Sequence, residues 1–74
     1  MTDQDILTFC KNVAFLREKN GIDKDEMASI CGVSVDELTQ IERGSLPKNL
    51  SVEIAIRLFR YFDISVEKLF CPLS

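Results

Sequence analysis

The segment from Ile22 to Gly44 constrains the fold of this chain more than any other. Its sequence, IDKDEMASICGVSVDELTQIERG, predicts two short helices joined by a tight turn. Helices that cross steeply over a short connection need a small residue where the backbones approach and a glycine where the chain turns; Ala28 and Gly32 supply them. Leu38 and Ile41 then give the second helix an apolar edge. This order is the signature of a helix-turn-helix, whose second helix usually enters the DNA major groove.

Apolar residues at helical spacing predict further helices on both sides of this segment. A first helix is expected over residues 5–20, a fourth over Val52–Phe62 after the N-cap Ser51, and a short fifth after the N-cap Ser65. Residues 44–50 are expected to form the loop before the fourth helix. The residues expected to face inward are Ile6, Phe9, Cys10, Val13 and Leu16 in the first helix, and Val52, Ala55, Leu58, Phe59 and Phe62 in the fourth.

Length and composition limit the classes of function. The 74 residues support one all-α domain over residues 1–74, with little room for an enclosed substrate cavity. The chain has no histidine and three widely spaced cysteines, which argues against a metal site; no cofactor is expected. Catalytic motifs such as GxSxG and HExxH do not occur, so no enzyme activity is expected. Six charged residues among the first twenty fit neither a signal peptide nor a membrane span, and indicate a cytoplasmic protein.

The charge balance leaves two hypotheses open. The chain has 9 basic and 12 acidic residues, a net charge of −3, whereas nucleic-acid binders usually present a basic face. A local basic patch remains compatible with that total. The alternative is a helix-turn-helix that binds a protein partner through an acidic face, as an antirepressor, an antitoxin-like protein or an adaptor. Within the central segment the anions are Asp23, Asp25, Glu26, Asp36, Glu37 and Glu42, and the cations are Lys24 and Arg43.

Three strings in order, NVAFLREKNGI, GVSVDELTQIERG and LFRYFDISVEKLF, resemble the Cro/C1-type (XRE-like) helix-turn-helix family of phage repressors and bacterial transcriptional regulators. The resemblance extends from about Val13 to Phe70. It implies a compact five-helix, lambda-repressor-like DNA-binding domain, in which the second and third helices form the helix-turn-helix. It also implies transcription regulation through double-stranded DNA, with a recognition helix at about Ser34–Arg43.

The resemblance implies roles for particular residues. Arg17 and Glu42 correspond to a partly buried ion pair that ties the first helix to the recognition helix. The base-reading positions fall on Val35, Asp36 and Gln40, with Glu37 and Thr39 nearby. By chemistry, Gln40 suits adenine, Val35 a thymine methyl group and Asp36 the amino group of cytosine. The residues expected to contact phosphates are Lys24, Ser34, Arg43, Lys48 and Asn49.

A homodimer that binds two half-sites about one helical turn apart is the expected form of such a regulator. Several apolar residues exceed what a small core obviously needs, and they are expected to form a self-complementary patch near the C-terminus. The alternative is that they anchor loops and the terminus. These residues are Leu46, Leu50, Ile56, Tyr61, Phe70 and Leu73.

Overall fold

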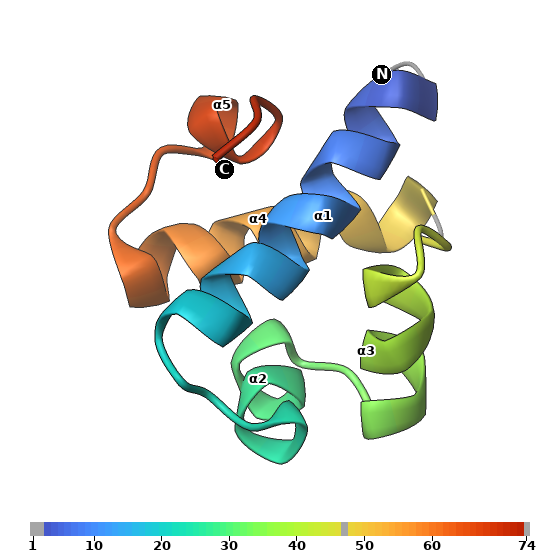
Figure 1. Cartoon of the computed structure of the whole chain (residues 1–74). Helices are drawn as coiled ribbons and strands as arrows, with labels where there is room; N and C mark the ends of the chain where they lie inside the picture. The colour runs from blue at the N-terminus through green and yellow to red at the C-terminus, as the bar shows by residue number, and fades with distance from the viewer. Residues whose placement is uncertain (1–2, 47, 74) are drawn as a thin grey trace.

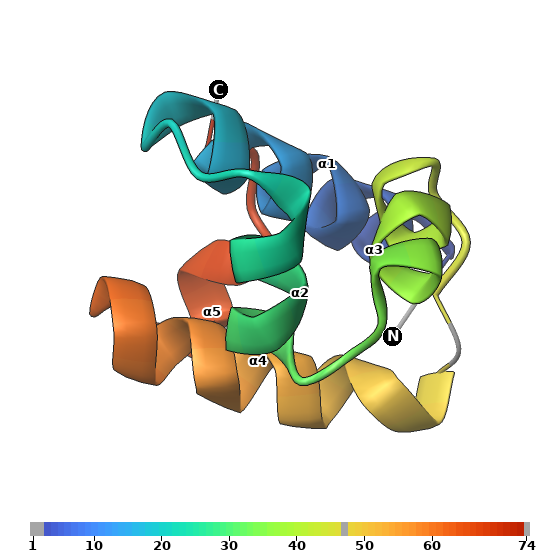
Figure 2. The ribbon, with the colours of Figure 1, turned by 90° about the horizontal axis from the view of Figure 1, so that it is seen from below.

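The computed structural model describes residues 3–46 and 48–73, with the backbone alone for Lys48, Asn49 and Ser51. Within these residues the chain forms five helices and no strand. Figure 1 shows their arrangement. In Figure 2, α1 and α4 form two layers with α2 and α5 between them, and α3 lies beside α1. The expected all-α, five-helix architecture is confirmed. The helices are α1 (Asp3–Lys19), α2 (Lys24–Cys31), α3 (Val35–Glu42), α4 (Lys48–Phe62) and α5 (Val66–Leu69).

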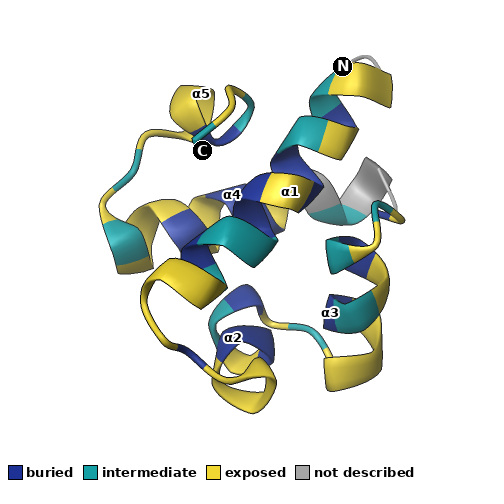
Figure 3. Cartoon of the chain, viewed as in Figure 1, coloured by how far each residue is buried: buried dark blue, intermediate teal, exposed yellow. Residues whose placement is uncertain are grey.

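The hydrophobic core draws on all five helices, and buried residues line the inward sides of α1, α2 and α3 (Figure 3). The apolar stripe predicted for α1 is confirmed, because all five of its residues are buried. Cys10 and Cys31 lie in this core as free thiols, and burial raises the pKa of Cys31 to about 11. The other core residues are Ile22, Met27, Ala28, Leu38, Ile41, Leu46, Ile54, Ala55, Leu58 and Leu69.

The first three helices end in the same way, on a glycine with positive φ. Gly21, Gly32 and Gly44 have φ values of 64°, 74° and 98°. In each case the glycine amide and the next amide donate back to carbonyl oxygens of the last helical turn, which is the Schellman arrangement. The accepting oxygens are those of Glu18 and Arg17 for α1, Ser29 and Ala28 for α2, and Ile41 and Gln40 for α3.

Gly32→Ala is expected to lower the free energy of unfolding by about 1–2 kcal/mol, because a residue with a Cβ is strained in the left-handed region. The added Cβ would also lie 2.7 Å from Nε of Arg57, so this side chain must move. Gly21→Ala is the matched control, since Gly21 has a similar φ and a Cβ added there would have nothing within 4 Å. Urea denaturation of both variants separates strain from crowding. Equal losses would show that Arg57 moves without cost.

The prediction for α4 is wrong in its start and in part of its inward face. The helix begins at Lys48, so Ser51 lies inside it and does not cap it. Val52 and Phe59 are 61% and 45% exposed, whereas Ile54 is buried. The core-facing residues repeat every four positions, and Val52 and Phe59 point toward solvent instead. This core-facing stripe consists of Leu50, Ile54, Leu58 and Phe62, and Ala55, which was predicted to face inward, is buried beside it.

The predicted loop before α4 is correspondingly too long, because the helix already includes three of its seven residues. The sequence Lys48-Asn49 is polar and follows a proline, a combination that favours a loop. The first amides of a helix have no partner within it, however, so two polar residues are equally compatible with a first helical turn. Pro47 itself lies outside the described residues.

A buried asparagine, which the sequence pattern did not identify, fastens the C-terminal residues to α1. Asn12 is 2% exposed. Its Nδ2 donates to the carbonyl oxygens of Leu69 (2.7 Å) and Cys71 (2.8 Å), and its Oδ1 accepts from the amide of Leu73 (3.2 Å). The Phe9 and Phe70 rings also join α1 to the C-terminal residues, stacking with centroids 5.0 Å apart. The predicted cap of α5 is confirmed, since the Ser65 hydroxyl accepts from the Lys68 amide.

Most of the apolar residues expected near the C-terminus as a self-complementary patch belong to the core instead. Leu46 is buried, and Leu50, Phe70 and Leu73 pack against the core. Loop and terminal anchoring, the alternative interpretation, therefore describes these four residues. Of the six, Ile56 and Tyr61 are exposed, and both belong to α4.

Candidate nucleic-acid interface

Helix α3 is fixed on one side and open on the other. Leu38 and Ile41 are buried, so this edge of α3 faces the core. Val35, Asp36 and Gln40 are exposed on the remaining surface, and Val35 has 37% of its area in solvent. In Figure 3 the first turn of α3 is coloured as exposed. The structure thus brings three of the four predicted base-facing residues onto one open surface.

The start of α3 is stabilised by a complete capping box. The Ser34 hydroxyl accepts from the Glu37 amide at 3.1 Å, and the Glu37 carboxylate accepts from the Ser34 amide at 3.0 Å. Two otherwise unpaired helix amides are satisfied in this way. One of the two leading acids of α3 therefore has a structural role. Ser34, a predicted phosphate contact, is exposed but already engaged in this cap.

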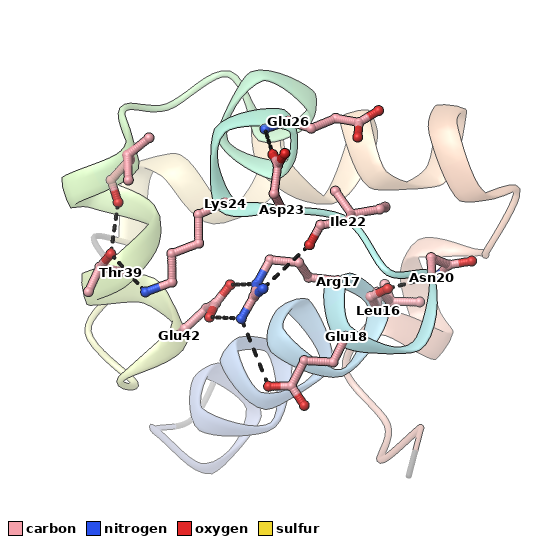
Figure 4. A network of polar contacts seen from close by, with 11 residues as sticks. Leu16, Arg17, Glu18, Asn20, Ile22, Asp23, Lys24, Glu26, Thr39 and Glu42 are labelled. Atoms are coloured by element: carbon pink, nitrogen blue, oxygen red, sulfur yellow. Dashed lines mark hydrogen bonds and ion pairs between the residues drawn. The ribbon is translucent and has the colours of Figure 1, made fainter.

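The end of α3 is tied to α1 by Arg17 and Glu42. Nε of Arg17 lies 2.7 Å from Oε2 of Glu42, and its Nη2 lies 3.1 Å from Oε1. Only 18% and 11% of the two side chains are exposed. The hydrogen bond to Glu42 raises the pKa of Arg17, and Glu18 adds a longer contact at 3.9 Å. This bidentate contact is drawn in Figure 4. It explains why Glu42 is tolerated at the C-terminal end of α3, where the helix dipole disfavours an anion.

Lys24 and Thr39 meet between α2 and α3, as Figure 4 also shows. Nζ of Lys24 donates to Oγ1 of Thr39 at 3.4 Å, and the Thr39 hydroxyl donates to the carbonyl oxygen of Val35 at 3.0 Å. Thr39 is half-buried, and its hydroxyl proton is directed to the backbone of its own helix. Lys24 is exposed, so an ammonium group lies beside the open face of α3.

The helix-turn-helix family model matches residues 13–69, which is most of the chain and includes α2 and α3. The protein belongs to the Cro/C1-type helix-turn-helix family. This is a family of DNA-binding transcription regulators, generally without enzyme activity. No curated protein and no solved structure matches the chain.

In this family member, much of the acidity of α2 and α3 has a structural explanation. The Asp23 carboxylate accepts from the Glu26 amide at 2.8 Å and so caps α2. With Glu37 in a cap and Glu42 paired to Arg17, three of the six anions interact with helix amides or a guanidinium. Negative charge near a helix N-terminus is favourable, because the amides there carry partial positive charge. The other three anions are Asp25, Glu26 and Asp36, all exposed.

The remaining predicted phosphate contacts follow α3 in the chain. Arg43 is exposed directly after the helix. Lys48 and Asn49 lie in the first turn of α4, and their side chains lie outside the described part of the structure. Among the described residues, no group of three potential ligands could hold a metal ion. None of the helices over residues 3–46 and 48–73 is long and apolar enough to cross a membrane.

Proposed function

We propose that this protein is a sequence-specific DNA-binding transcriptional regulator that inserts α3 into the major groove as a homodimer. The observation that carries the proposal is that α3 is held at both ends and exposed between them. A capping box fixes its start and the Arg17–Glu42 pair fixes its end, while Val35, Asp36 and Gln40 are exposed between them. A rigid helix with an open polar face suits direct reading of base edges.

Each exposed side chain suits one kind of base contact. Gln40 offers an amide that matches the N6 and N7 groups of adenine, and Val35 offers an apolar contact for a thymine methyl group. Asp36 accepts from the amino group of cytosine, but it is repelled by the flanking phosphates. It therefore favours selectivity over tight binding. Thr39 has a lesser role in this proposal, because its hydroxyl is engaged with α3 and Lys24.

Phosphate binding is assigned to Lys24, Arg43 and Lys48, with Ser34 and Asn49 as neutral donors. Three cations per subunit neutralise about six phosphates in a dimer, which gives a slope near −5 in a plot of log affinity against log salt. Arg43→Ala is expected to make that slope less steep without changing the preferred sequence. Lys68→Ala is the control, because this exposed lysine belongs to α5, which lies apart from α3 in Figures 1 and 2, and is expected to leave the slope unchanged.

Selection from randomised duplex DNA at two salt concentrations tests the proposal and yields the preferred site. With that site, Gln40→Ala is expected to lose about 1–3 kcal/mol of discrimination at one base position, because a bidentate contact is removed. Thermal unfolding of the same variant should match that of the wild type, since Gln40 is exposed. An unchanged preference at every position would remove Gln40 as a base-reading residue.

The second candidate function is binding of a basic protein through the exposed acids at the starts of α2 and α3. Asp25, Glu26 and Asp36 favour it, because all three are exposed acids in the first turns of these helices. The selection experiment separates the two functions. If no sequence is enriched and binding is weaker than about 10⁻⁴ M even at low salt, below the usual nonspecific range, the DNA-binding proposal is wrong.

A further inference from the structure

Helix α4 carries an apolar stripe that the fold leaves exposed. Val52, Ile56 and Phe59 are 61%, 42% and 45% exposed. With about 100° between successive residues, the three side chains leave the helix within about 60° of one another. They point about 150° away from the buried side formed by Ile54 and Leu58. Exposed apolar residues that gather on one face usually mark an interaction surface.

Two opposite charges border this stripe on the same side. Glu53 and Arg60 are seven residues apart, so they lie on one flank of α4, two turns or about 10.5 Å from each other. Within the subunit, Glu53 lies 3.6 Å from Arg57, and both side chains of that pair are largely exposed. Glu53, Ile56 and Arg60 also line a groove of about 490 Å³ between α2 and α4, which leaves space beside the stripe.

We infer that two copies of this chain associate through α4 in an antiparallel pair, with the two-fold axis near Ile56. This inference specifies the surface of the dimer proposed above. The two Ile56 side chains meet at the centre, and Val52 of each copy packs against Phe59 of the other. A two-fold axis across antiparallel helices places equal flanks on the same side, as in antiparallel coiled coils. Glu53 of each copy then faces Arg60 of the other, at nearly the same height along the helices.

The charge pattern identifies a second copy as the occupant. Glu53 and Arg60 lie three and four residues from Ile56, at nearly equal distances on either side of the axis, so the face is complementary to itself. The two-fold axis forms two ion pairs and leaves neither charge opposite a like charge. A partner with a uniformly acidic face would repel Glu53, and one with a uniformly basic face would repel Arg60. The register also places the two α3 helices at opposite ends of the α4 pair. The starts of the two α4 helices are then about 25 Å apart, which is comparable with the ~34 Å between half-sites.

Charge exchange tests this register without DNA, so its failure is distinct from failure of DNA binding. Sedimentation equilibrium over a range of concentrations should show a dimer for the wild type. Glu53→Arg or Arg60→Glu alone should raise the dissociation constant at least about tenfold, because each brings like charges together twice. The double variant E53R/R60E should restore it to near the wild-type value.

The control is E53R/R57E, which restores the pair within one helix but leaves Arg60 facing a new arginine. It should stay as weak as Glu53→Arg, and circular dichroism should show unchanged helix content in all variants. A wild type that stays monomeric at millimolar concentration would overturn the inference and assign the stripe to another protein. A dimer insensitive to the single exchanges, or one that E53R/R60E does not rescue, would overturn it as well.

Discussion

Replacing Asn12 with alanine is expected to lower the free energy of unfolding by about 2–4 kcal/mol, which is a large part of the stability of a domain this small. The substitution removes three hydrogen bonds at a position that is 2% exposed. It leaves the carbonyl oxygens of Leu69 and Cys71 and the amide of Leu73 without their partner. Urea denaturation measures the loss.

Hydrogen exchange shows whether the loss arises where the structure places it. The Leu73 amide donates to Oδ1 of Asn12, so its exchange should accelerate in the variant more than that of the core amides. Asn20→Ala is a matched control, because Nδ2 of Asn20 also donates to a carbonyl oxygen, that of Leu16, from an exposed position. A loss from Asn12→Ala no larger than from Asn20→Ala would contradict the role of Asn12.

Removing either member of the Arg17–Glu42 pair is expected to cost about 2–3 kcal/mol, and removing both is expected to cost little more. Each single variant leaves a charge that is mostly shielded from water and has lost its partner. The expected loss is below the ~3–5 kcal/mol typical of fully buried pairs, because both side chains retain some exposure. Denaturation of Arg17→Ala, Glu42→Ala and the double variant gives a coupling energy of about 2 kcal/mol.

A second double variant, R17M/E42L, distinguishes stability from orientation. Apolar residues of similar volume often replace a buried ion pair at no cost, so this protein should unfold near the wild-type midpoint. Without the bidentate Arg17–Glu42 contact, however, the end of α3 is held less firmly to α1. The affinity for the selected DNA site should therefore fall. A coupling energy near zero would mean that packing alone holds α3 against α1.

The helix-turn-helix could be predicted from the sequence because its determinants are local. The caps Asp23 and Ser34 and the glycines Gly32 and Gly44 act within a few residues of their own position. The spacing of apolar residues in α1 and α3 likewise predicts which face of each helix lies against the core. These signals need no knowledge of the rest of the fold.

The errors concern features that depend on distant contacts. Ser51 has the chemistry of a cap, and only the packing of Leu50 and Ile54 against the core shows that the helix already includes it. Asn12 looks like an ordinary polar residue on a helix, because its three partners lie 57 to 61 residues away.

Counting charges along the sequence also overstates the acidity available to a ligand near α3. Glu37 contributes to that count as an anion, although its carboxylate accepts from the Ser34 amide. The three-residue spacing from Ser34 is compatible with a capping role, but spacing alone does not show where a flexible carboxylate lies. The candidate surface is therefore defined better by its hydrogen bonds than by its net charge.

The division of labour within α3 has an evolutionary consequence. The capping box, the glycine ending and two buried side chains maintain the helix, while Val35, Asp36 and Gln40 are exposed. Folding therefore constrains those three positions less than it constrains the buried edge of α3. Under the proposed function, a lineage with this scaffold can change its target sequence through a few surface replacements, without passing through unstable intermediates.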